Sequence, residues 1–215
     1  MNAPLAAKAF QARSISLASR YGGRTVLAIG GMLARLSRES ARVVMAVVSI
    51  PSDFETRRAE AQRAAAILGC ELRILMDDEA TRIDDIKNYR LVGMLDTLVR
   101  ELEPAAVLTH SANEFHRDHV TVHNACISTQ RLKPFDFFHF NPTMCRPVPV
   151  QFYPRAYVDV TSTLELKMEA IAAHTSQFGA RGLEAEMYRD LARLTGRMVG
   201  VKYAEGIDVS RMLLA

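Results

Sequence analysis

The first half of the chain alternates between short apolar runs and longer segments in which apolar and polar residues recur at helical spacing. The apolar runs, which are typical of strands buried on both faces, lie at residues 25–29 (TVLAI), 42–50 (RVVMAVVSI), 71–75 and 105–109. The segments with helical spacing lie at residues 32–40, 53–69 and 84–102. This alternation predicts an α/β fold, with a parallel sheet that has helices on both faces.

The second half of the chain is less regular. Further strands are expected at residues 135–140, 152–160 and 203–214, and further helices at 164–177 and 183–195. Met1 to Arg24 mixes Ala, Ser and Arg without a continuous apolar stretch, so we interpret it as an N-terminal extension and not as a signal peptide. Residues 25–215 are then expected to form a single domain.

Composition narrows the class of protein. The chain has 215 residues, of which 49% are hydrophobic and 24% charged, as in ordinary globular domains, and no apolar run is long enough to span a membrane. The net charge is only +3 and the basic residues are scattered, which argues against binding to nucleic acid. Three cysteines without a CxxC pair argue against a disulfide framework, so the expected location is the cytoplasm.

Four of the six histidines fall between positions 110 and 123, in the segment HSANEFHRDHVTVH. The segment follows the strand predicted at 105–109, and in parallel sheets reactive groups lie on loops at the carboxyl ends of strands. Within it, His116, Asp118 and His119 form an H-x-D-H cluster, in which one imidazole could bind a metal, another could transfer protons and the carboxylate could orient either ring. Alternatively, these residues cap the next helix or are simply solvated.

Several segments resemble the PIG-L/LmbE-like zinc-dependent de-N-acetylases, which mainly hydrolyse N-acetyl groups of glucosamine-containing substrates. The H-x-D-H segment resembles the second signature of that family, and RRAEAQRAAAILG resembles one of its helices. VDVTSTLELKMEAIAAHTSQ, with Asp159, Lys167 and His174, resembles a later motif, and YAEGIDV resembles the closing strand. The resemblance covers about residues 25 to 210 and implies a Rossmann-like three-layer sandwich with a mostly parallel sheet.

The resemblance also implies roles for individual residues. His119 would be a Zn²⁺ ligand, His116 the proton donor or the group that stabilises the oxyanion, and Asp118 the residue that orients the neighbouring imidazole. Substrate contacts are expected from a further set, Arg57, Asp77 and His174. The expected partner is a small N-acetylated sugar, and the chain could form a homo-oligomer.

One part of the family pattern is missing. The first signature, A-H-P-D-D-E or a close variant, follows the first strand, precedes a Gly-Gly pair, and supplies a His and an Asp to zinc together with the Asp that acts as general base. Here the predicted strand at 25–29 runs directly into Gly30 and Gly31, so about ten residues of an active-site loop are absent. Either the loop was left out of this sequence, because it was unobserved or deleted, or the natural protein lacks it. Asp53, His110, His123 and His174 are conceivable replacement ligands.

Three functions are therefore open. The first is a zinc-dependent amidohydrolase that removes acetyl from an N-acetylated amino sugar. The second is an inactive relative that acts as a sugar-binding or scaffolding module. A dinucleotide-binding module is a third and weaker alternative, because Gly30-Gly31 follows an apolar run but the G-x-G-x-x-G spacing is absent.

Overall fold

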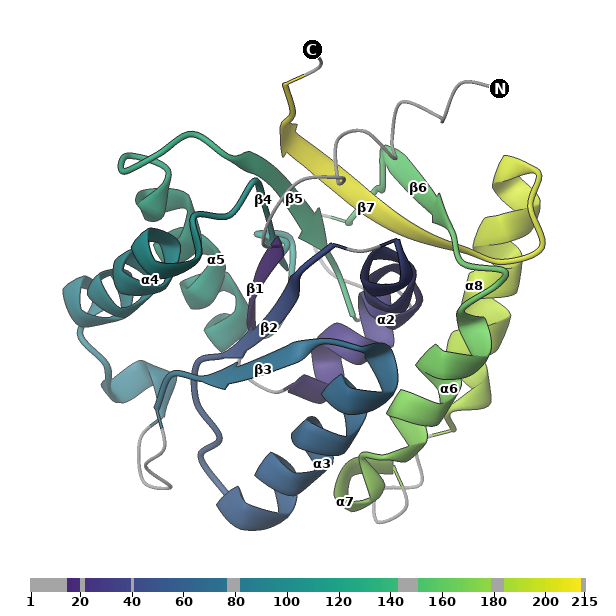
Figure 1. Cartoon of the computed structure of the whole chain (residues 1–215), viewed down its shortest axis with the longest axis horizontal. Coiled ribbons are helices and arrows are strands. Elements are labelled where there is room, and N and C mark those ends of the chain that lie inside the picture. Colours follow the sequence, from purple (N-terminus) through teal and green to yellow (C-terminus); the bar gives the residue numbers. More distant parts are fainter. Residues whose placement is uncertain are drawn as a thin grey trace.

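The fold is a single mixed sheet with helices on both faces (Figure 1). The computed structural model describes residues 15–19, 22–39, 41–76, 82–142, 151–178 and 184–213. The strands are β1 (Ile15–Ser19), β2 (Val43–Val47), β3 (Glu71–Ile74), β4 (Ala106–His110), β5 (Asp136–Phe140), β6 (Ala156–Asp159) and β7 (Ala204–Arg211). The helices are α2 (Gly22–Arg38), α3 (Phe54–Leu68), the 3₁₀ turn η1 (Ile83–Asp85), α4 (Asn88–Leu102), α5 (Arg117–Thr129), α6 (Leu164–Ala172), α7 (Thr175–Phe178) and α8 (Glu186–Val199).

The strand order is β3-β2-β1-β4-β5-β7-β6. The first five strands in this order are parallel, and in register Leu17 of β1 lies between Met45 of β2 and Leu108 of β4. β7 is antiparallel to both β5 and β6. The parallel sheet expected from the alternation of strands and helices is therefore present, and the last two strands make the whole sheet mixed.

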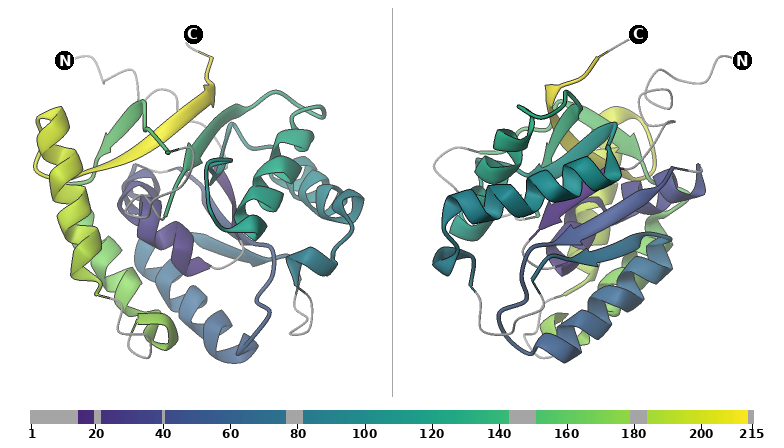
Figure 2. Two further views of the ribbon diagram at one scale, coloured as in Figure 1. Left: turned by 180° about the vertical axis from the view of Figure 1, so that it is seen from behind. Right: turned by 60° about the vertical axis from the view of Figure 1, so that its left-hand side comes forward.

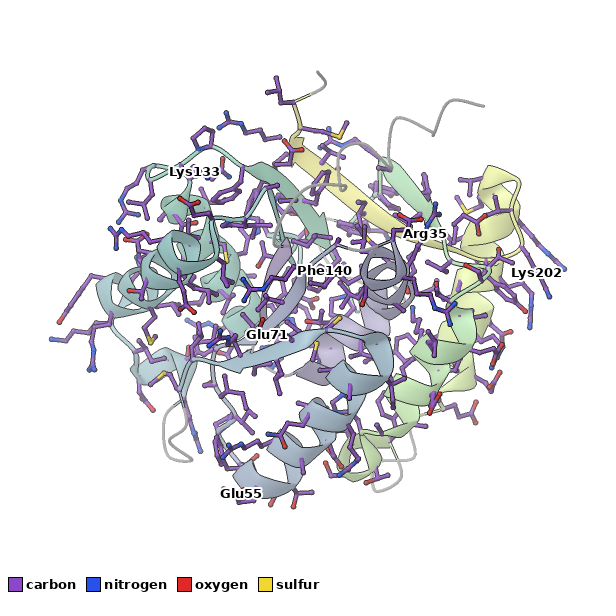
Figure 3. The ribbon with its side chains drawn as sticks, in the orientation of Figure 1. Arg35, Glu55, Glu71, Lys133, Phe140 and Lys202 are labelled. Atoms are coloured by element: carbon purple, nitrogen blue, oxygen red, sulfur yellow. The ribbon has the colours of Figure 1, made fainter. Side chains whose placement is uncertain are left out.

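Two layers of helices cover the sheet. The front and back views place α4 and α5 on one face and α2, α3, α6 and α8 on the other (Figures 1 and 2). Alternate residues of β2 explain how one strand serves both layers: Met45 packs in the core under α2 and α3, whereas Val44 and Ala46 pack against Leu98 of α4. Phe140, which is fully buried, lies near the middle of the molecule (Figure 3).

The first strand is not where the sequence pattern placed it. Residues 25–29 lie within helix α2, and the central strand is β1 at Ile15–Ser19, inside the segment expected to be an N-terminal extension. Val26 and Ile29 are 0% exposed and Leu27 is 7% exposed, so this part of α2 is buried nearly all round. A helix segment buried in this way is as uniformly apolar as a buried strand, and the run TVLAI could not distinguish the two.

With β1 at residues 15–19, no loop is missing between the first strand and Gly30. Ten residues, 20–29, separate the end of β1 from Gly30, and they are the expected length of the loop and helix start that seemed absent. Gly30 and Gly31 lie inside α2, just after Ile29, where the backbone leaves helical geometry (φ −134°, ψ 21°) and the helix bends. The prediction that a segment had been lost is therefore wrong.

The bend in α2 is held by a buried ion pair. The carboxylate of Glu205 on β7 accepts hydrogen bonds from the backbone N–H groups of Gly31 (2.9 Å) and Met32 (2.7 Å), which the bend leaves without partners in the helix. Lys167 on α6 donates to the same carboxylate at 2.7 Å, and both side chains are almost completely buried. Lys167 and Glu205 thus tie α6, β7 and α2 together.

Candidate active site at the carboxyl edge of the sheet

The candidate site lies where β4 ends and α5 begins. β4 ends at His110, and the connection to Arg117 at the start of α5 carries Glu114, which is 8% exposed. The Glu114 carboxylate accepts hydrogen bonds from the backbone N–H groups of Phe115 (3.0 Å) and His116 (3.4 Å). Glu114 therefore fixes the connection just before the helix and places the H-x-D-H residues on its first turn.

Three imidazole rings stack at this place. His119 is 0% exposed, its ring lies 3.9 Å from that of His110 with an interplanar angle of 5°, and 4.7 Å from that of His116 with an angle of 20°. The Nδ1 atom of His119 lies 3.6 Å from Glu114 Oε2, and Nδ1 of His116 lies 3.9 Å from Asp118 Oδ2. The structure thus brings together all three residues of the H-x-D-H cluster and adds His110 and Glu114.

Burial keeps the imidazole rings of His110 and His119 neutral at neutral pH. Burial is the main reason that the pKa of His110 is well below its ordinary value, and electrostatic interactions with the neighbouring His119 and Arg24 lower it further. Burial also lowers the pKa of His119, although its interactions with Glu114 oppose this, and Arg24 again contributes to the lowering. Arg24, on the first turn of α2, therefore adds positive charge close to the imidazole stack.

His123 is engaged in the packing of α5 against the sheet. Its Nδ1 atom lies 2.7 Å from the carbonyl oxygen of His110, so Nδ1 carries the proton and donates it to that oxygen. The His123 ring meets His139 of β5 edge to face at 4.7 Å, and both histidines are buried. His123 therefore fastens α5 to β4 and β5, and it is not placed to replace a missing metal ligand.

A second group of polar residues is formed by α3 and the α6–α7 turn. Glu60 of α3 accepts hydrogen bonds from the N–H and hydroxyl groups of Ser176 (2.6 and 2.7 Å) and from the Thr175 hydroxyl (3.0 Å). Burial would raise the pKa of Glu60, but these hydrogen bonds and His174 lower it below the ordinary value. His174 is 1% exposed, with its Nδ1 atom 3.9 Å from Glu60 Oε2. Burial lowers the pKa of His174 to about 4.

His174 reaches the start of α2. A methyl group placed on Gly23 would lie 3.4 Å from the His174 ring and 3.4 Å from the side-chain amide of Gln177. Gly23 is followed by Arg24, whose charge acts on His110 and His119. The first turn of α2 therefore bridges the imidazole stack and the group formed by Glu60 and His174.

The predicted substrate contacts lie at different places. Arg57 of α3 has a side chain that is 10% exposed and lies 3.8 Å from Asp53, one turn earlier. Asp77 lies outside the described residues.

A surface pocket of about 380 Å³ opens beside the stack and is lined by Pro51, Ser52, Arg82, Asp84, His116, Arg117 and Asp118. His116 and Asp118 thus both border the pocket, and His116 is the more exposed of the two, with 28% of its side chain accessible against 6% for Asp118.

The described residues at this site do not fit a catalytic zinc. Such an ion needs three protein ligands, and an imidazole binds it in the plane of the ring at about 2.0–2.1 Å. The His110 and His119 rings are nearly parallel and stacked, so one ion cannot lie in both ring planes. Across the residues that the structure describes, no three His, Cys, Asp or Glu side chains are grouped so as to hold a metal ion. Residues 20–29, RYGGRTVLAI, contain none of these four residue types.

The two thiols in the described part of the chain offer no substitute chemistry. Burial raises the pKa of Cys70 and of Cys126 to about 12, so both remain protonated and unreactive at neutral pH. Cys145 lies outside the described residues.

Sequence reasoning assigned no role in the site to three of its residues. Glu114 lies two residues before His116, and its hydrogen bonds to the backbone of Phe115 and His116 do not follow a helix-capping pattern that the sequence could have signalled. Glu60 was noted only as part of a helix resembling the family pattern. Arg24 was hidden because the strand was placed one element too late in the chain.

Comparison with known proteins gives one family and several solved structures. The family model described as GlcNAc-PI de-N-acetylase, PIG-L, matches residues 25–129. GalB, the 4-carboxy-2-hydroxymuconate hydratase from Pseudomonas putida KT2440, is 19% identical with a TM-score of 0.81, over 95% of this chain and 98% of that chain. The conserved protein TT1542 from Thermus thermophilus is 20% identical with a TM-score of 0.79, over 95% and 97% of the two chains.

N,N'-diacetylchitobiose deacetylase from Pyrococcus horikoshii has the same fold as well. It is 18% identical with a TM-score of 0.73, over 94% of this chain and 84% of that chain. At such identities the structural likeness establishes the fold. The family match begins at Thr25, after the segment that directly follows β1.

Proposed function

The chain belongs to the PIG-L family, and from this we propose that it binds a small N-acetylated sugar at the carboxyl edge of its sheet without zinc-dependent hydrolysis. The observation that carries the proposal is the composition of residues 20–29. They occupy the place between the first strand and Gly30 where the family signature supplies two zinc ligands and the general base, and they contain no His, Cys, Asp or Glu. His119 alone remains from the expected ligand set.

The side chains that remain suit binding. His116 and Arg117 border the pocket of about 380 Å³, where an imidazole and a guanidinium can donate hydrogen bonds to sugar hydroxyl or acetamido oxygens. Arg57 is held near Asp53 and contributes a further donor, and the pocket adds a carboxylate acceptor in Asp84. We propose that His116 and Arg57 contact the ligand, and that Asp118 positions His116.

The alternative is the hydrolysis that the family resemblance implies, in which Zn²⁺ is bound at His119. It is favoured by a specific observation, the grouping of His116, Asp118 and His119 at the end of β4. The stacking of His119 on His110 disfavours it, because the ring would need to separate from His110 before a metal could be shared with other ligands. Most of the compared solved structures with this fold are deacetylases and one is a hydratase, so the fold alone does not select the reaction.

Zinc content and acetate release test the proposal together. Protein purified with added Zn²⁺ is dialysed and its metal content measured, and acetate release from N,N'-diacetylchitobiose is followed with and without Zn²⁺. We expect less than one zinc in ten protein molecules, no acetate above the buffer rate, and sugar binding that is the same in EDTA. One zinc per chain that is lost in His119→Ala, together with acetate release, would overturn the proposal in favour of the hydrolase.

Adjacent arginines provide a matched pair for the binding site. Arg57 has a nearly buried side chain, whereas Arg58 is exposed and lies over the Phe54 ring at 6.0 Å. Arg57→Gln should weaken sugar binding about tenfold, as expected for the loss of one charged hydrogen bond, while Arg58→Gln leaves it unchanged. Equal effects in the two variants would contradict the assignment of Arg57.

A further inference from the structure

Helix α8 has two apolar faces. It lies at the edge of the molecule beside α6, and an ion pair between Arg189 and Glu165 connects the two helices (Figures 1 and 2). The inner face of α8 packs against the rest of the protein through four buried residues, Tyr188, Ala192, Thr195 and Gly196. This contact is close, since a methyl group on Gly196 would lie 2.8 Å from the backbone of Lys202. The inner face therefore fixes how α8 is oriented.

The second apolar face of α8 is open to solvent. It consists of four residues at spacings of four, three and four, Met187, Leu191, Leu194 and Met198, which we call the α8 stripe. On a helix this spacing places the side chains in one line, as in helices that pack against another helix. Leu191 is half-buried, whereas Met187, Leu194 and Met198 are 41%, 59% and 68% exposed. Large apolar side chains gathered in this way mark an interaction surface, unlike single apolar residues scattered over a surface.

The charges beside the α8 stripe are complementary to themselves. Asp190 and Arg197 are both exposed, and each directly precedes a residue of the stripe, so they lie along the same flank. When two copies of α8 pack antiparallel about a two-fold axis, this flank faces its own copy with the residue order reversed. Asp190 of each copy then faces Arg197 of the other. A parallel pair would instead need the side of α8 that carries Tyr188 and Thr195, which is already buried in the protein.

We infer that the α8 stripe binds a second copy of this chain, and that the two α8 helices pack antiparallel with Asp190 of each copy beside Arg197 of the other. This surface shares no residue with the pocket at His116, so the inference does not depend on sugar binding. α8 has 14 residues and is about 21 Å long, so the helix pair alone buries less than the roughly 800 Å² per partner of a standard interface. We therefore expect a reversible dimer with a Kd of about 1–50 µM.

Sedimentation velocity of the full-length chain at about 1 to 200 µM tests the surface. The unaltered chain should change from monomer to dimer over this range. Leu194→Glu and Met198→Glu should each weaken the dimer about a hundredfold, because the two-fold axis places the new charge in the interface twice. Ile127→Glu, which replaces a similarly exposed apolar residue on α5, is the matched control and should leave the dimer unchanged. Circular dichroism checks that each variant folds. A chain that is monomeric at the highest concentration, or a dimer that both stripe variants retain, would overturn the inference.

Charge reversals test the antiparallel pairing. Asp190→Arg makes both flank charges positive and Arg197→Asp makes both negative, so each variant alone should dimerise about tenfold more weakly than the unaltered chain. An equal mixture of the two variants should form dimers again, because every arginine on one flank then faces an aspartate on the other. Asp190 also pairs with Arg193 of its own chain at 2.6 Å, and Arg193→Gln, which removes that pair, is the control and should not weaken the dimer. Undiminished dimers of each single variant, or no gain on mixing, would overturn the inference.

Discussion

At the scale of single residues, the site is governed by what each side chain touches. His119 could be a metal ligand by its type, but its ring is stacked on His110 at 3.9 Å and its Nδ1 atom faces Glu114. His116, three residues earlier, borders the surface pocket and faces Asp118. The two histidines of the motif are therefore accessible to different extents. His119 is buried between other imidazole rings, whereas His116 can contact a molecule in the pocket.

The effect of replacing a glycine by alanine also depends on the space around it, and Gly31 and Gly93 give a testable prediction for stability. A methyl group on Gly31 would lie 2.8 Å from Cβ of Val160, whereas nothing lies within 4 Å of the equivalent position on Gly93 of α4. Gly31→Ala should lower the free energy of unfolding by about 1–3 kcal/mol through overpacking. Gly93→Ala should raise it by about 0.5–1 kcal/mol, because alanine favours the helix. Urea denaturation of the pair measures both, and a stabilised Gly31→Ala variant would contradict the packing described here.

At the scale of elements, helix α2 has two parts with separate roles. Its first turn lies at the candidate site, and after the bend at Ile29 its second part packs in the core and receives Glu205 at Gly31 and Met32. The N–H groups freed by the bend would be buried without partners if Glu205 were absent. Lys167 serves this structure, although by sequence it belongs to a motif that resembles the family's active-site region.

Glu205→Gln tests the role of the pair. The substitution leaves the Lys167 ammonium buried without its counter-ion, so the free energy of unfolding should fall by about 3–5 kcal/mol, as measured by urea denaturation. Replacing both partners, as in Lys167→Met with Glu205→Gln, removes the unpaired charge and should recover part of this loss. If Glu205→Gln is as stable as the unaltered chain, the pair does not support the bend.

At the scale of the whole molecule, the histidines couple stability to pH. Burial lowers the pKa of five of the six histidines, and it brings His139 and His174 to about 4. They come from β4, α5, β5 and the α6–α7 turn, so the effect is spread over both faces of the sheet.

Among the described residues, no helix is long and apolar enough to cross a bilayer.

The sign of the pH dependence follows from these shifts. Below about pH 6.5 the unfolded chain binds protons that the folded chain refuses, so the free energy of unfolding should fall as the pH is lowered from 6.5 towards 4. His139 and His174 should each contribute on the order of 1–3 kcal/mol over this range. Urea denaturation at pH 7.5, 6 and 5 measures the slope, and His139→Asn should make it shallower. Equal stability at pH 7.5 and 5 would contradict neutral, buried histidines.

Much of the fold could be predicted from the sequence. The strands at β2, β3, β4 and β5 and the helices between them were expected within a few residues, because short apolar runs bounded by Gly and Pro are a local signal. The PIG-L resemblance was confirmed by the family match over residues 25–129. The roles assigned to His116, Asp118, His119, Arg57, Asp77 and His174 stay predictions, as does the expectation of a homo-oligomer.

Local sequence patterns indicated the resemblance to the PIG-L family, the alternation of strands and helices, and the residue types that could meet at the end of β4. That TVLAI is helical follows from the packing of the folded chain, because uniform burial erases the periodicity by which a helix and a strand differ in sequence. The stacking of His119 on His110, and the electrostatic influence of Arg24 on both rings, likewise depend on how the end of β4, α5 and α2 come together in space. The ten residues that seemed to be absent are therefore residues 20–29, which follow β1. None of them is a His, Cys, Asp or Glu that could bind zinc.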